Sequence, residues 1–276
     1  MTMKLRKIYI PLVAAVLCSC EKVLDFKYVS VEPIYVIEAT VSNEGTTALI
    51  TKTRDVESTS DAPTVDNATV TMTGSDGSQT TLTNEGNGIY TSPVKGVEGV
   101  TYTLKANIGN VTTQSTSVMP DEIKYEDSYF YRMPMLGDSL YVYKITLADD
   151  GKQPRYYYIR IMRNDKMYRW MLSDNKVAND GKIVFNCSLF ANNEGDDEKE
   201  KREEWLHDGD KLDISVSLID ETAYNYFFSL SIAESNNCNP LPNFTSGVLG
   251  LFSARSIYRI PTITYDQSSI GEDPDK

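Results

Sequence analysis

Cys20 has the residue type and the surroundings that most clearly predict chemistry. It closes the run Leu17-Cys18-Ser19-Cys20, which follows a short apolar segment near the N-terminus. A cysteine after a small residue at this place is typical of a lipobox, where the thiol forms a thioether to diacylglycerol before the preceding peptide is cleaved. We therefore predict lipid attachment at Cys20, while Cys18 leaves with the removed peptide.

The residues before Cys20 have the composition of a secretory signal. Residues 1–7 contain three basic residues and no acidic one, and an apolar core follows at residues 8–17. This core is too short to cross a bilayer as a helix, which takes about 20 apolar residues, but it fits a signal peptide. We predict a lipoprotein signal over 1–19 and a polar tether over 20–32. A plain secretory signal with a chance cysteine is the alternative.

The charge of the chain limits its partners. The net charge is −12, and removal of residues 1–19 takes away three basic groups and no acidic one, which makes it −15. Such a chain is repelled by nucleic acids and by anionic lipids, so we expect no nucleic-acid partner. Two or more acyl chains, with about 0.8 kcal/mol for each buried methylene, still hold such a chain on a membrane.

Two further cysteines remain in the chain after signal cleavage. They are Cys187 and Cys238. Once Cys20 carries lipid, these two form an even pair in an oxidising compartment, where cysteines are often bonded. Two arrangements fit the sequence: a Cys187–Cys238 disulfide, or two buried free thiols.

Residues 33–119 alternate short strand patterns with turn signals. Residues 101–108 and 111–118 flank Gly109-Asn110, which suits a two-residue hairpin turn. About seven short strands without a helical period predict an immunoglobulin-like or transthyretin-like β-sandwich. Residues 119–121, Met-Pro-Asp, interrupt the pattern, and we place a domain boundary there. The other strands are expected at residues 34–41, 48–53, 68–73, 79–83 and 88–90.

Residues 120–265 predict a second β-rich domain with one covering helix. Asp220 is a suitable N-cap, and apolar residues recur at helical spacing over 221–234, so we expect a helix that covers the second sheet. A hairpin is expected about Asn164-Asp165. A polar tail follows at 266–276. The strands of this domain are expected at residues 141–147, 156–162, 166–172, 183–189, 211–218 and 254–263.

Two stretches of the second domain allow more than one interpretation. Tyr156, Tyr157 and Tyr158 either form a platform that stacks on sugar rings or pack on both faces of a sheet. The charged insertion at 192–210 lacks the spacing of a calcium-binding EF-hand loop, so we expect a solvated loop there.

Residues suited to catalysis are sparse. His207 is the only histidine, and the chain contains neither a Gly-x-Ser-x-Gly motif nor a Gly-rich phosphate loop. Zinc sites usually need several histidine or cysteine ligands, and no spacing singles out a carboxylate pair for glycoside hydrolysis. We therefore expect no enzymatic activity, no metal and no cofactor. A hydrolase that uses carboxylates alone is the weakest of the alternatives.

The C-terminal region carries a family resemblance. It reads Asn-Cys-Asn-Pro-Leu-Pro-Asn over residues 237–243 and Gly-Val-Leu-Gly-Leu-Phe-Ser-Ala over residues 247–254. Together with the lipobox and short motifs at 35–39, 68–70, 88–90 and 99–102, this order resembles domain of unknown function family 4249, lipoproteins of the Bacteroidota. Cys238 and the acidic insertion depart from the family pattern.

The resemblance implies an outer-membrane lipoprotein of a kind often encoded beside TonB-dependent transporters, with no catalytic residues to transfer. We expect a lipid-anchored accessory or ligand-binding partner of such a transporter, on the periplasmic face or the cell surface. Its ligand would be a glycan or a peptide. The alternative is a surface adhesin or glycan-binding lipoprotein that acts without a transporter.

Overall fold

The structure is a computed structural model that describes residues 32–55, 58–135, 138–189, 205–236 and 239–274. Cys20, Cys238 and residues 192–204 of the charged insertion lie outside these ranges, so the predictions made for them stay predictions. Pro33–Lys276 form one compact unit. No helix in the described ranges is long and apolar enough to cross a membrane.

The described residues are mainly in β-strands, many of which alternate buried and exposed positions. Strand β7, for example, buries every second residue, as expected for a strand with one face in a core. In chain order the strands are β1 (Tyr35–Ser42), β2 (Gly45–Lys52), β3 (Ala68–Gly74), β4 (Gln79–Thr81), β5 (Thr83–Gly86), β6 (Ile89–Ser92), β7 (Thr101–Ile108), β8 (Val111–Val118), β9 (Tyr125–Met135), β10 (Asp138–Ala148), β11 (Tyr156–Arg163), β12 (Lys166–Asp174), β13 (Lys182–Leu189), β14 (Lys211–Ile219) and β15 (Leu249–Thr264). The helices are η1 (Asn175–Val177), α2 (Glu221–Asn236) and η2 (Gln267–Ser269).

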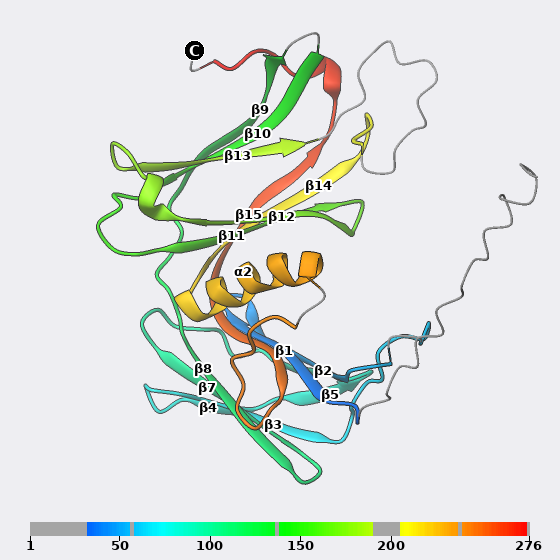
Figure 1. The fold of residues 1–276 in the computed structure, drawn as a ribbon. Coiled ribbons are helices and arrows are strands. Elements are labelled where there is room, and N and C mark those ends of the chain that lie inside the picture. Colours follow the sequence, from blue (N-terminus) through cyan, green and yellow to red (C-terminus); the bar gives the residue numbers. More distant parts are fainter. Residues whose placement is uncertain (1–31, 56–57, 136–137, 190–204, 237–238, 275–276) are drawn as a thin grey trace, which may run out of the picture. The chain divides into compact units, whose positions relative to one another are not determined.

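Strand β15 joins the two halves of the largest sheet. Its residues 249–255 pair in parallel with β1, and residues 256–264 pair in antiparallel fashion with β14. The strand order is β12-β11-β14-β15-β1-β2-β6-β5. Figure 1 shows β11, β12, β14 and β15 of this sheet beside α2.

Two asparagine side chains bond backbone groups of β15 where a neighbouring strand does not. Ile257 lies past the last residue that pairs with β1, and Phe252 lies before the first residue that pairs with β14. Asn43 bonds the backbone N–H and C=O of Ile257, and Asn243 bonds those of Phe252.

One face of the largest sheet packs on the two smaller sheets. The first core contains Ile37 and Phe252 from the largest sheet and Leu104 from the sheet β4-β3-β7-β8. The second core contains Ile161 from the largest sheet and residues of the sheet β13-β10-β9. Ile270, from the predicted polar tail, also packs in the second core. Each fully buried side chain of this size contributes about 1.5–3 kcal/mol, so both cores hold the largest sheet in place.

Helix α2 covers part of the opposite face of the largest sheet. Asp220 caps it, because its carboxylate accepts a hydrogen bond from the Ala223 N–H at 2.8 Å. The Phe227 ring stacks on the Tyr158 ring of β11 with 4.4 Å between centroids, and Leu251 of β15 joins this cluster. Figure 1 shows α2 beside these strands. The predicted helix, its N-cap and its covering role are confirmed.

The predicted fold class is confirmed as well. The described residues are mainly β, with a sandwich of two facing sheets around the first core and one α-helix over a second region of strands. The hairpins about Gly109-Asn110 and Asn164-Asp165 are present. Asn164 and Asp165 both have positive φ, at 49° and 64°, the geometry that a tight two-residue hairpin turn requires.

Several strands differ from the sequence prediction. The single strand expected at 79–83 is two short strands, β4 and β5, which belong to different sheets. Strand β9 was not predicted, because its clustered aromatic residues and Pro134 give no clear alternation; it pairs with β10. Strand β15 begins at Leu249 instead of residue 254, because Gly250 is typical of a loop but here lies within a strand. The largest sheet contains strands from both sides of residue 119, and the domain boundary predicted there stays a prediction.

Candidate functional site

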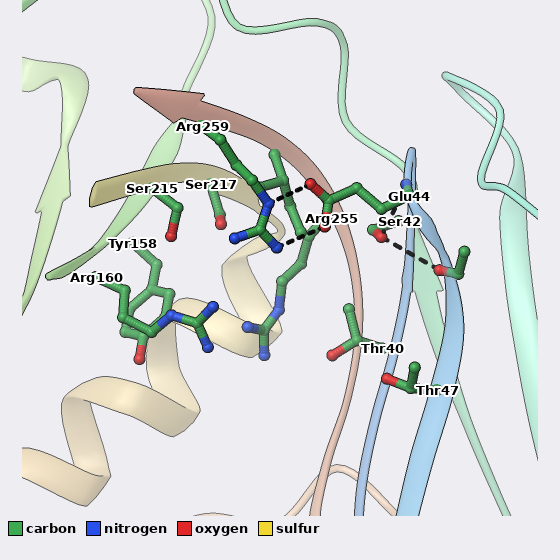
Figure 2. A pocket seen from close by; sticks show the side chains of 12 residues that line it. Thr40, Ser42, Glu44, Thr47, Tyr158, Arg160, Ser215, Ser217, Arg255 and Arg259 are labelled. Atoms are coloured by element: carbon green, nitrogen blue, oxygen red, sulfur yellow. Dashed lines mark hydrogen bonds and ion pairs between the residues drawn. The ribbon is translucent and has the colours of Figure 1, made fainter. Parts of the chain in front are cut away.

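A polar pocket of about 300 Å³ lies where β15 passes from β1 to β14, on the face of the sheet that α2 covers. We call it the basic pocket, because Arg160, Arg255 and Arg259 reach into it from β11 and β15 (Figure 2). Most of the other residues that line it are polar or small: Thr40, Ser42, Glu44, Gly45, Thr47, Tyr158, Ser215, Ser217 and Ile257.

Strand alternation explains why these residues share one face. Side chains two positions apart on a strand point to the same side, which places Tyr158 with Arg160, and Arg255 with Arg259. In the register of the sheet, Arg160 lies opposite Ser215 of β14, and Ser215 lies opposite Arg259. The backbone positions of Arg160 and Arg259 are therefore about 10 Å apart across three strands, with a serine between them.

Arg259 is held by the turn between β1 and β2. Its Nε and Nη2 groups donate hydrogen bonds of 2.5 Å and 2.7 Å to the two carboxylate oxygens of Glu44. The same turn is tied to β15 by Asn43, whose bonds to the Ile257 backbone are both 2.9 Å long. The hydrogen bond from Arg259 lowers the pKa of Glu44 below its ordinary value. Glu44 is therefore a carboxylate at neutral pH and neutralises Arg259.

Arg255 is held by aromatic rings rather than by a carboxylate. Its Cζ lies 5.6 Å from the centre of the Tyr158 ring and 5.2 Å from that of Phe227, which is cation–π distance. Its Nε is buried and has no hydrogen-bond partner among the described residues. Burial lowers the pKa of Arg255 to about 10, an effect that Tyr158 opposes and the charge of Arg160 adds to. The guanidinium still carries its proton at neutral pH.

Arg160 completes the pocket from β11. It forms no ion pair with a carboxylate of the described chain, and Figure 2 shows its guanidinium directed into the same space as that of Arg255. The pocket thus contains three cationic groups and one carboxylate. Glu38 and Asp220 act on Arg255, and Arg160 acts on Glu44, through longer-range charge interactions. Neither Arg160 nor Arg255 forms an ion pair in the described part of the chain.

This arrangement suits the binding of an oxyanion. A guanidinium offers several N–H donors in a planar fork, which matches the oxygens of a carboxylate or a phosphate. The hydroxyl groups of Ser215, Ser217 and Thr40 line the same space and can donate or accept hydrogen bonds.

The structure describes Cys187, one of the two cysteines considered for a disulfide. Cys187 lies in β13, is 1% exposed, and packs in the second core. It has no disulfide partner among the described residues, but Cys238 is outside them, so the pairing stays a prediction. Burial raises the pKa of the Cys187 thiol to about 12. Lipid attachment at Cys20 also stays a prediction, since Cys20 is outside the described ranges.

His207 and the tyrosine run are separated by the fold. His207 does not line the basic pocket; its backbone N–H donates to Asp210 at 2.8 Å. Tyr157 packs in the second core, whereas Tyr158 packs against α2 on the opposite face. These tyrosines therefore pack on both faces of the sheet, and Tyr158 also lines the basic pocket.

The three arginines were not singled out by the sequence analysis. Arg255 and Arg259 are four residues apart on a strand, and this even spacing is the one local signal that places both on one face. Arg160 comes from a distant strand. Only the register of β11, β14 and β15 brings it beside the other two.

The fold and the site define a mainly β protein with an arginine-lined pocket beside the helix that covers its largest sheet. The chain belongs to the family described as Domain of unknown function (DUF4249), which matches residues 21–257. This confirms the family that the sequence motifs indicated.

Comparison with proteins of known description adds little more. No curated protein matches the chain. Among solved structures, a two-domain fibronectin type-III segment of chicken tenascin is similar, with 10% sequence identity and a TM-score of 0.21. The similarity covers 85% of this chain and 100% of the tenascin segment. A score of this size carries no argument about fold or function.

Proposed function

We propose that this chain is a non-enzymatic, lipid-anchored lipoprotein of the Bacteroidota outer membrane that binds a small ligand and assists a TonB-dependent transporter. The lipobox that ends at Cys20 supports the anchor. The order of the sequence motifs, which resembles that of outer-membrane lipoproteins often encoded beside such transporters, supports the transporter as a partner. The basic pocket supports the binding role.

The binding role rests on which charged groups of the basic pocket are paired with each other. Neither Arg160 nor Arg255 forms an ion pair with a carboxylate among the described residues, although Glu38 and Asp220 act on Arg255 at longer range. The one lining carboxylate, Glu44, is held by Arg259. A general acid or base must exchange a proton with its substrate near neutral pH. Glu44, with its lowered pKa and its two bonds to Arg259, is poorly suited to that role. The pocket therefore favours binding over proton-transfer catalysis.

A second candidate is a glycan-binding surface lipoprotein that acts without a transporter. The hydroxyl groups of the basic pocket favour it, because serine and threonine bond sugar hydroxyls as donors or as acceptors. Affinity purification from gently solubilised outer membranes separates the two candidates. Co-isolation of a TonB-dependent transporter supports the first. Retention on a polysaccharide array without any transporter in the eluate supports the second.

The anchor is tested separately by labelling cells with palmitate. We expect label in the wild-type chain and none in Cys20→Ser, which should leave the membrane fraction. Cys18→Ser is the matched control, because Cys18 lies in the peptide that the lipobox predicts to be removed. Equal labelling of the two variants contradicts the proposed anchor. Protease treatment of intact cells then tells whether the body faces outward or toward the periplasm.

A further inference from the structure

We propose that the basic pocket binds a small hydroxylated ligand through a carboxylate or phosphate group, which lies between the guanidinium groups of Arg160 and Arg255. This inference rests on the binding role proposed above and names the chemical class of the ligand. It is independent of the lipid anchor and of the transporter.

The first argument is the balance of charge inside the pocket. A charge removed from water costs free energy unless a partner or hydrogen bonds compensate it. Arg255 has a buried Nε without a hydrogen-bond partner in the described chain, and it faces a second cation, Arg160. An oxyanion bound between the two guanidinium groups would offset the repulsion between them, which Glu38 and Asp220 reduce only at longer range.

The second argument is that Arg255 is positioned before any ligand binds. Contacts with the Tyr158 and Phe227 rings hold its guanidinium, and Tyr158 itself is fixed by stacking on Phe227. A preorganised group loses little conformational freedom on binding, which favours affinity. Figure 2 draws no hydrogen bond from the Arg255 guanidinium to the other pocket residues.

The third argument concerns the body of the ligand. The hydroxyls of Thr40, Ser215 and Ser217 line the pocket, and Figure 2 draws no hydrogen bond from them to other pocket residues. They are suited to a ligand with hydroxyl groups of its own. A volume of about 300 Å³ is at the small end of ligand sites, which fits one sugar-sized unit.

Glu44 acts in this scheme as an internal competitor. Its carboxylate occupies the fork of Arg259 with two hydrogen bonds, as the ligand's oxyanion would occupy Arg160 and Arg255. Glu44→Gln removes the negative charge and releases the third arginine. The variant should therefore bind an anionic ligand more tightly than the wild type does.

The test is isothermal titration calorimetry of the purified chain with four probes: glucuronate, glucose 6-phosphate, inorganic phosphate and glucose. We expect glucuronate or glucose 6-phosphate to bind at least about tenfold more tightly than glucose, since hydrogen bonds to charged groups are worth about 1.5–3 kcal/mol. The two sugar anions distinguish a carboxylate from a phosphate site. Inorganic phosphate shows whether the hydroxylated body is needed.

Variants decide whether binding occurs at this pocket. Arg160→Gln should lose most of the preference for the anion, and Glu44→Gln should gain affinity. Arg132→Gln, on an exposed residue of β9 outside the pocket, removes the same charge and should behave like the wild type. Circular dichroism checks that each variant is folded.

The inference is overturned by equal affinity for glucose and the sugar anions, by no binding of either anion, or by equal losses in Arg160→Gln and Arg132→Gln. Weaker binding in Glu44→Gln contradicts the competitor role. None of these assays contains a membrane or a transporter. If neither sugar anion binds but a transporter co-isolates with the chain, only the ligand class is rejected. If an anion binds but no transporter co-isolates, only the transporter role is rejected.

Discussion

Gly250 of β15 lies directly against the backbone of Ile37 in β1, with no space for a side chain. A Cβ at residue 250 would lie 2.1 Å from the Ile37 carbonyl oxygen, and the residue has φ of +102°. The two residues are register partners in the parallel pairing that joins the first and last strands of the described chain. This contact gives a structural reason for the glycine in the run at residues 247–254.

Gly250→Ala should therefore destabilise the fold strongly. We expect the free energy of unfolding to fall by about 3 kcal/mol or more, because backbone strain and a backbone clash act together. Urea denaturation measures it. Gly247→Ala is the control, since Gly247 also has positive φ but nothing within 4 Å of the added Cβ. Equal losses in the two variants would show that close packing against Ile37 is unimportant.

Asn43→Ala should loosen the turn that carries Glu44. The substitution removes two hydrogen bonds to the Ile257 backbone and leaves that N–H and C=O without these partners. We expect a loss of about 1–3 kcal/mol in urea denaturation. Asn110→Ala, in the turn between β7 and β8, is the matched control and should change little. A loss no larger than that of the control would contradict the bridging role.

Asp220→Ala should destabilise the start of α2 and its contact with β8. Asp220 accepts from the Ala223 N–H and also from the Ser117 hydroxyl, which itself accepts from the Ala254 N–H. We expect a loss of about 1–2 kcal/mol on thermal or urea unfolding. Asp220→Asn keeps an acceptor and should lose less. If both variants lose equally, the negative charge matters more than the capping bond.

The Glu44–Arg259 pair should stabilise the fold only above the acid range. Arg259 lowers the pKa of Glu44 below its ordinary value of 4.5. The contribution is therefore complete above that value and is lost as the pH falls through the lowered pKa. The pair is largely exposed, so the wild type should exceed Glu44→Gln by less than about 1 kcal/mol near pH 7. Urea denaturation from pH 7 to 3 should show this difference shrinking; a constant difference argues against the pair as its source.

Cys187 should be protected from thiol reagents in the folded chain. It is buried, and its pKa is raised to about 12, so almost no reactive thiolate exists at pH 8. We expect no modification by iodoacetamide until the chain is unfolded under reducing conditions. Rapid modification of Cys187 itself in the native chain, located by peptide mapping, contradicts the buried position. Peptide mapping without reductant shows whether Cys187 and Cys238 are bonded.

Local sequence patterns predicted much of the fold. Strands 101–108 and 111–118 were predicted to the residue, because a clear alternation and a Gly-Asn turn bound them. Helix α2 was predicted from Asp220 and the spacing of apolar residues. Strand β9 was missed because its aromatic residues obscure the alternation, and the start of β15 was missed because Gly250 is typical of a loop.

The sequence by itself determined the elements whose signals are local: the class of the fold, the hairpin turns and the capped helix. The basic pocket was decided by the tertiary structure alone. Arg160 and Arg255 lie on strands far apart in the chain, and only the pairing of β14 with both β11 and β15 brings them to one face. The physical reason is that side-chain alternation is a property of one strand, whereas a site across strands depends on register, which long-range packing sets.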